Sequence, residues 1–94
     1  MKSSKKPFQI EQLVLSGQEF HTLPTSSFSL FTNLRYIDLS FSNIEIVEEF
    51  AFDDNRKLEV MLLSGNRIEG LPNLFTDEDH ALGEIEILFP VTWQ

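Results

Sequence analysis

The sequence predicts an α/β fold in the form of a solenoid of stacked repeats, and two observations predict it. Ile10, Leu34, Leu58 and Leu82 follow one another at steps of 24 residues, and other apolar residues recur with them. Within each copy, the apolar residues at the fourth and sixth positions are spaced by two, as in a strand with one buried face. A chain that returns to a parallel strand at every repeat must cross over in between, which predicts a parallel ladder on one side and turns on the other.

The period also sets the expected boundaries. Residues 1–9 are predicted to form a basic, flexible tail and the start of the N-terminal edge, because the tail is polar and Pro7 ends it. The repeat domain is expected to span 10–94, with repeats at 10–33, 34–57 and 58–81 and a partial fourth at 82–94. The strands are expected at Gln12–Leu15, Tyr36–Leu39, Val60–Leu63 and Glu84–Ile87.

The segments between the strands carry a second apolar set that would close the core from the other side. Its members are Phe20, Ile44 and Ile68 at position eleven, Leu23, Val47 and Leu71 at position fourteen, and Phe28 and Phe52 at position nineteen. A short helix is expected over Glu45–Asn55, where Val47, Phe50 and Ala51 would share one face. Thr76 followed by Asp79 resembles a helix-capping pair, which predicts a turn of helix there.

The charge of the chain is strongly uneven. Its formal net charge is −8, but three lysines lie in the first six residues. From Pro7 onward four basic residues face 15 acidic ones, which leaves that part at −11. Such an acidic body repels phosphate backbones, so nucleic acid is not expected as a partner. A protein or peptide with a basic surface is favoured instead.

Composition also bears on the compartment. The chain contains no cysteine, which agrees with a reducing environment. Its first nine residues do not have the pattern of a signal peptide, and no apolar run is long enough to span a membrane. We therefore expect a cytoplasmic protein if the chain is complete, and an extracellular one if it is a fragment of a receptor-type protein.

Few residues offer catalytic or metal chemistry. His21 falls in a turn without a paired base or nucleophile in the pattern, so a solvated surface histidine is the simpler interpretation. The densest cluster of possible ligands is 77–80, but it lacks the spaced oxygens and the glycine turn of a calcium loop. We expect no enzymatic activity, no metal and no cofactor.

These positions resemble the leucine-rich repeat, and specifically its typical subclass of 24 residues. The resemblance covers Ile10 to Phe89, and its closest copy is Leu58–Pro72. It implies a short, curved, right-handed coil with the strand ladder on the concave face, short helices or turns on the convex face, and binding of other proteins. In the family, an asparagine at position nine bonds neighbouring turns in a ladder. Here only Asn66 matches, with Gln18 and Ser42 at the equivalent places, so an irregular ladder is expected.

The outward positions of the strands form the candidate binding face. Alternation along a strand turns positions three and five to solvent, with positions two and seven beside them. The predicted contact residues are Tyr36, Asp38, Phe41, Val60, Leu62, Arg35, Glu59 and Glu86. Tyr36, Val60 and Leu62 would form an apolar centre with a charged rim, which is typical of a binding patch. Alternatively, Arg35 serves as an ion-pair partner of Glu11 and Glu59 on the neighbouring strands.

Two hypotheses for the function follow. The first is a protein-interaction module that binds a protein or peptide through the concave face. Four strands by five residues give a flat patch of roughly 220 Å², well below the ~800 Å² that each partner contributes to a standard interface, which favours a peptide. The alternative is a structural fragment or self-assembling unit of a longer repeat protein. Its motivation is the lack of obvious caps and the apolar residues Leu88, Phe89, Val91 and Trp93 at the C-terminal edge.

Overall fold

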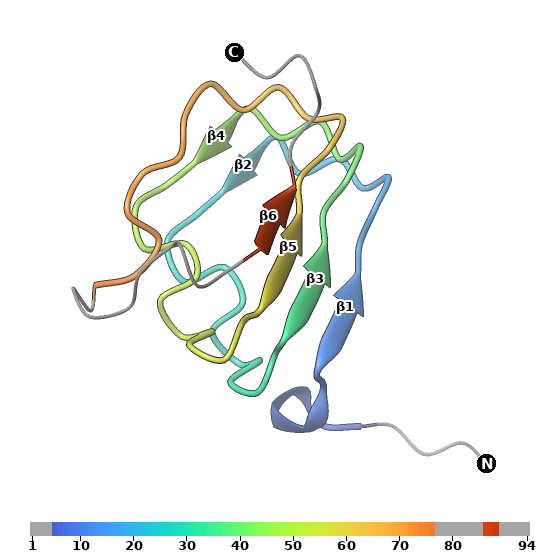
Figure 1. The fold of residues 1–94 in the computed structure, drawn as a ribbon, viewed down its shortest axis with the longest axis vertical. Coiled ribbons are helices and arrows are strands. Elements are labelled where there is room, and N and C mark those ends of the chain that lie inside the picture. The colour runs from blue at the N-terminus through green and yellow to red at the C-terminus, as the bar shows by residue number, and fades with distance from the viewer. Residues whose placement is uncertain (1–4, 77–85, 89–94) are drawn as a thin grey trace.

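The computed structural model describes residues 5–76 and the backbone of residues 86–88. A 3₁₀ turn, η1 (Pro7–Gln9), precedes the first strand. Four strands, β1 (Gln12–Val14), β3 (Tyr36–Asp38), β5 (Val60–Leu62) and β6 (Glu86–Leu88), form a parallel sheet in that order. Two shorter strands, β2 (Thr22–Leu23) and β4 (Ile46–Val47), form a second parallel pair on the opposite side of the coil (Figure 1). The predicted parallel ladder is therefore confirmed.

The first three strands of the sheet keep the predicted register. Leu13 lies beside Ile37, and Ile37 lies beside Met61, so equivalent positions of successive repeats are paired. Their side chains follow the predicted alternation, because the middle residue of β3 and of β5 is fully buried while its two neighbours are half-exposed. The 24-residue spacing thus places one apolar row of the sheet in the core and turns the flanking rows outward.

The register of the last strand is a correction. The period predicted a strand at Glu84–Ile87 with Ile85 beside Met61, but β6 pairs Ile87 with Met61. Glu86, expected beside Leu62, lies beside Val60 instead, and Leu88 takes the place next to Leu62. A shift of two residues preserves the alternation along a strand, so the sequence pattern is compatible with either register. Ile85 and Ile87 therefore satisfy the pattern equally, and the sequence alone does not choose between them.

The core lies between the two sheets. Its most buried side chains come from the first, fourth, sixth and eleventh positions of repeats two and three, and from the return segments. They are Leu34, Ile37, Leu39, Ile44, Leu58, Met61, Leu63 and Ile68, together with Leu23, Phe28, Val47, Ala51, Phe52, Leu74 and Phe75. The rings of Phe28 and Phe52, at the nineteenth position of adjacent repeats, are stacked with centroids 5.7 Å apart. The predicted second apolar set therefore closes the core from the return side.

The helix predicted over Glu45–Asn55 is wrong. This segment begins with β4 and continues as turns. Most of its backbone bonds go to neighbouring repeats, since the Glu48 N–H donates to the Leu23 carbonyl and the Phe50 N–H to the Asn73 carbonyl. Its internal bonds are those of single turns, from the Asp53 N–H to the Phe50 carbonyl and from the Asn55 N–H to the Phe52 carbonyl. Phe50 also has a φ of 61°, which a right-handed helix does not accommodate. Bonds between repeats have replaced the local bonds of a helix, so the return side carries strands and turns, and no α-helix occurs among the described residues.

The asparagine ladder is irregular, as predicted. The Asn66 side chain accepts hydrogen bonds from the backbone N–H groups of Ser42 and Ile44 at 2.9 and 3.0 Å. Its amide nitrogen donates to the carbonyls of Leu39 and Leu63 at 2.8 and 3.1 Å. One repeat earlier the shorter Ser42 hydroxyl lies 3.1 Å from both the Leu15 and the Ser40 carbonyls. Of the two links between repeats one, two and three, the one between repeats two and three thus has the full set of bonds among the described residues.

A second asparagine links the repeats on the return side. Asn55 is fully buried, and its amide nitrogen donates to the carbonyls of Phe28 and Phe31, each at 2.9 Å. It bonds the turn of repeat two to the turn of repeat one, in the place where the family pattern has a final leucine. Its amide nitrogen thus satisfies two backbone carbonyls, while its side-chain oxygen is buried without a hydrogen-bond partner among the described residues.

Some expectations fall on other parts of the chain. The capping pair of Thr76 and Asp79 includes a residue outside those described. The apolar residues expected at the C-terminal edge, Leu88, Phe89, Val91 and Trp93, have no described side chains. Among the helices that the structure describes, none is long and apolar enough to cross a membrane.

Candidate protein-binding face

The predicted binding face consists of the outward residues of the four-stranded sheet, and we call it the strand face. Its described side chains are Gln12 and Val14 on β1, Tyr36 and Asp38 on β3, and Val60 and Leu62 on β5. Tyr36 is paired with Val60, and Asp38 with Leu62. Tyr36, Val60 and Leu62 are all half-buried. The predicted apolar centre is therefore brought together on two adjacent strands.

The half-burial of this centre has a physical cause. Paired residues of adjacent strands stand close enough for their side chains to touch along the row, so each covers part of its neighbour. The row behind them, with Ile37 and Met61, is 0 % exposed. A side chain that is held on both sides by a rigid sheet loses little further rotamer freedom when a partner covers it. The strand face thus offers apolar area that is already ordered.

Phe41 extends the apolar area at the turn after β3. It is 69 % exposed, and its backbone has a φ of 53°. Its ring lies directly over Gly65, at the equivalent position of the next repeat, where a Cβ atom would collide with the ring. Gly65 has a φ of 75° and so suits the turn in its own right. The structure therefore keeps a large aromatic side chain in solvent, in a backbone region that costs free energy for a residue with a side chain.

The charged members of the predicted set are engaged within the sheet. Arg35 forms an ion pair with Glu59 at 2.6 Å and a longer one with Glu11 at 3.8 Å. The interpretation of Arg35 as a neighbour-strand partner is thus confirmed. Asp38 accepts a hydrogen bond from the Ser40 N–H at 2.9 Å and closes the turn after β3. The ion pairs are about half exposed, so each contributes at most about 1 kcal/mol. The side chain of Glu86 is not among those described.

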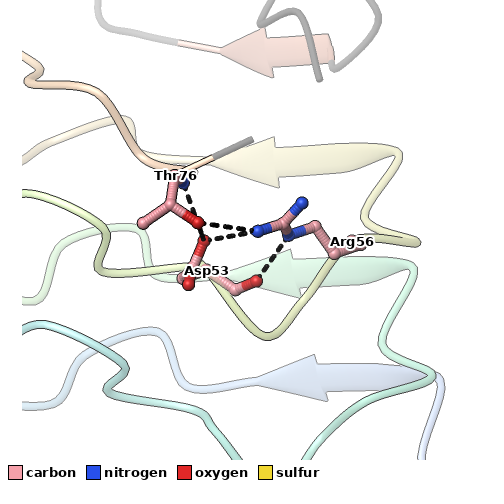
Figure 2. Close-up of polar contacts among 3 residues, drawn as sticks. All are labelled: Asp53, Arg56 and Thr76. Carbon is pink, nitrogen blue, oxygen red and sulfur yellow. Dashed lines mark hydrogen bonds and ion pairs between the residues drawn. The ribbon is translucent and has the colours of Figure 1, made fainter. Parts of the chain in front are cut away.

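A polar cluster on the return side was not predicted from the sequence (Figure 2). One oxygen of Asp53 accepts hydrogen bonds from the Thr76 N–H at 2.7 Å, the Thr76 hydroxyl at 2.8 Å and the Arg56 guanidinium at 2.7 Å. The Arg56 guanidinium also lies 5.9 Å from the centre of the Phe75 ring. Two features of the sequence pointed to this cluster. Asp53 and Arg56 are oppositely charged and three residues apart, and Thr76 stands 24 residues after Phe52, at the equivalent position of the next repeat.

This cluster makes the stability of the fold depend on pH. The hydrogen bonds from Thr76, chiefly from its backbone N–H, and then Arg56 hold the pKa of Asp53 below its ordinary value of 3.8. A lowered folded-state pKa stabilises the native state above the unfolded value, and this contribution is lost as the pH falls through the folded pKa.

We therefore expect Asp53→Asn to lower the free energy of unfolding by about 1 kcal/mol at neutral pH, because a charge-assisted bond becomes a neutral one. The difference from the native protein should shrink below pH 3.8 and vanish below the folded pKa of Asp53. Urea unfolding followed by circular dichroism at a series of pH values measures it. Asp54→Asn, which removes a neighbouring negative charge, is the control. An equal difference at every pH, or an equal effect of the control, would contradict the assignment.

The described residues show no group of three or more histidines, cysteines, aspartates or glutamates placed to hold a metal ion. The acidic run at 77–80 lies outside those residues, so its predicted solvation is untested. His21 is exposed and lies 3.6 Å from Glu45, which is a surface contact between repeats. Of the predicted site residues, the structure thus brings Tyr36, Val60 and Leu62 together on adjacent strands.

Comparison with known proteins bears on this arrangement. A protein-family model described as "Leucine rich repeat" matches residues 9–68, which is more than half of the chain and includes β1 to β5. Searches of curated proteins and of solved structures gave no significant match. The family match covers β3 and β5, the two strands that carry Tyr36, Val60 and Leu62. It ends at the eleventh position of repeat three, before the register of the last strand departs from the period.

Proposed function

We propose, from the premise that this chain belongs to the leucine-rich repeat family, that it binds a peptide or an extended protein segment through the strand face. Domains of this family are generally protein-interaction modules and are typically non-catalytic. The observation that carries the proposal is the apolar centre of Tyr36, Val60 and Leu62, which is half-exposed on a rigid sheet over a fully buried row. An aromatic and two aliphatic side chains at the middle of a face are the composition of an interface centre.

The charges around this centre favour a basic partner. Glu59 is paired with Arg35, whereas Asp38, at the strand end beside Leu62, forms no ion pair among the described residues. Beyond the tail, the chain carries an excess of eleven negative charges, which raises the local concentration of a cationic partner. We therefore propose a ligand with apolar side chains for the centre and lysine or arginine at its flanks. A peptide fits the small area better than a large globular surface does.

Selection from a library of random displayed peptides would provide such a ligand. We expect the selected peptides to combine apolar residues with lysine or arginine and to bind more weakly as salt is raised. Titration of one such peptide into ¹⁵N-labelled protein should shift the backbone amide signals of Tyr36, Asp38, Val60 and Leu62. Shifts confined to the return side, at Leu30 and Ile46 for example, would contradict the proposal. Those two residues are suitable reporters because both are exposed apolar residues away from the strand face.

A further inference from the structure

The N-terminal end of the coil is apolar and incompletely covered. Repeat one has apolar residues at positions one, four, six and eleven, like the repeats that follow it. Leu34, Ile37, Leu39 and Ile44 at these positions of repeat two are 0 % exposed. Their counterparts in repeat one, Ile10, Leu13, Leu15 and Phe20, are all half-buried. Repeat one differs from repeat two in having no preceding repeat beside it among the described residues. Phe8, in η1 beside this end, is itself 52 % exposed.

The backbone of β1 has a free edge at the same end, visible on one side of the sheet in Figure 1. In the ladder, the Arg35 and Tyr36 N–H groups donate to the preceding strand, and the Asp38 carbonyl accepts from it. The equivalent groups of repeat one are the N–H groups of Glu11 and Gln12 and the carbonyl of Val14. They face the outer edge of β1, where the described part of the chain places no strand. An edge of this kind is a template for one more strand.

A hollow lies beside this edge and gives it a side-chain site. Its volume is about 540 Å³, and it is lined by Lys5, Ile10, Glu11, Gln12 and Leu13. Ile10 and Leu13 supply an apolar wall that belongs to the core row of the sheet. In the β-augmentation mode of recognition, backbone bonds supply affinity and pockets for alternate side chains supply specificity. Outward-facing backbone groups and a hollow for a side chain are both present at β1.

The charges on the sheet specify the occupant further. At position two, Glu11, Arg35 and Glu59 alternate in sign across three adjacent strands. Arg35 lies 2.6 Å from Glu59 but 3.8 Å from Glu11, so Glu11 is the carboxylate with the weaker pairing. Glu11 is also 64 % exposed. A strand added outside β1 would place its own position two beside Glu11, and a basic residue there would continue the alternation.

We propose that the outer edge of β1 binds an extended peptide segment as an additional parallel strand, with a basic residue beside Glu11 and aliphatic residues beside Leu13 and Leu15. The segment therefore has the pattern basic-x-aliphatic-x-aliphatic. This site uses the outer edge of β1, whereas the function proposed for the strand face rests on Tyr36, Val60 and Leu62 of β3 and β5, so it does not depend on that function. It differs in mechanism as well, because its ligand is held by main-chain bonds in addition to side-chain contacts.

A synthetic peptide with the core Arg-Thr-Ile-Thr-Leu tests the proposal by isothermal titration against the full chain. In the geometry of this ladder, the Ile and Leu amides of the peptide face β1 and the two Thr amides face away. We expect N-methylation of the Ile and Leu amides to weaken binding at least about tenfold. N-methylation of the two Thr amides, with identical side chains and added methyl groups, is the matched control and should leave the affinity within about threefold. Equal losses for the two methylated peptides, or no binding by the parent peptide, would overturn the proposal.

Charge exchange and two protein variants complete the experiment. Glu11→Lys should weaken the arginine peptide about threefold to fivefold and strengthen a peptide with Glu in its place. A double variant of the strand face, Tyr36→Ala with Leu62→Ala, should bind the edge peptide as the native chain does, so failure of either site is seen separately.

If the peptide-free protein sediments as a dimer that Val14→Pro converts to a monomer, the occupant is a second copy and the proposal is overturned. Proline is suited to this test because it removes an outward N–H from an edge strand.

Discussion

Substitution of Asn66 by alanine should lower the free energy of unfolding by about 3 kcal/mol, through the loss of four hydrogen bonds from one side chain. Three of the backbone groups that Asn66 bonds belong to repeat two, on Leu39, Ser42 and Ile44. The fourth is the Leu63 carbonyl of its own repeat. Ile44 and Leu63, two of the residues whose backbone groups Asn66 bonds, are almost fully buried. An effect of this size is a large part of the stability of a small domain, which is typically 5–15 kcal/mol.

Gln18→Ala is the matched control for this prediction. Gln18 stands at the same ninth position in repeat one, is exposed, and makes no side-chain hydrogen bond within the described residues. Its substitution should change the free energy of unfolding by less than about 0.5 kcal/mol. Chemical unfolding of both variants, monitored by far-ultraviolet circular dichroism, decides between them. If Asn66→Ala costs no more than Gln18→Ala, the side-chain ladder does not hold repeats two and three together.

The strands and the apolar rows of the first three repeats could be predicted from the sequence, because side-chain alternation and the repeat period act together. The fourth position of each repeat faces the core because alternate side chains of a strand point to the same side. The residues at this position are Leu13, Ile37 and Met61. The ion pair of Arg35 with Glu59 also follows from the period, because equal positions of adjacent repeats become neighbours. Local pattern and repeated spacing thus predict contacts between residues far apart in the chain.

The errors have physical causes of their own. The apolar spacing in Glu45–Asn55 suits a helix, but backbone bonds to the adjacent repeats compete with it and win, as the contacts of Glu48 and Phe50 show. The last strand was displaced because Ile85 and Ile87 are interchangeable in a pattern of period two. The cluster around Asp53 depends on Thr76 of the next repeat, whose side chain shows no pattern of its own. Polar contacts between repeats are specific to single residues and carry no periodic signal.

The chemistry of the strand face explains how a cysteine-free chain with few histidines would still act on another protein. Tyr36, Val60 and Leu62 present preordered apolar area, and Phe41 adds a ring that is held in solvent over Gly65. Under the proposed function, the acidic excess of the chain favours cationic partners. The site proposed at the edge of β1 would add a second mode that relies on backbone bonds. Both proposed sites are small, which suits extended ligands.

The central claim is that Tyr36 and Leu62 anchor the ligand of the strand face, and the affinity of a double variant tests it most directly. Combined truncation of an aromatic and an aliphatic anchor at an interface centre should weaken binding of a selected peptide about 100-fold. The control is Leu30→Ala with Ile46→Ala, which truncates two exposed apolar residues off the strand face.

Isothermal titration of the native protein and both double variants, each shown to be folded by circular dichroism, is the decisive measurement. We predict a loss of about 100-fold for Tyr36→Ala with Leu62→Ala and a change of less than about threefold for the control. Unchanged affinity in the folded Tyr36 and Leu62 variant would contradict the claim that the strand face is the binding site.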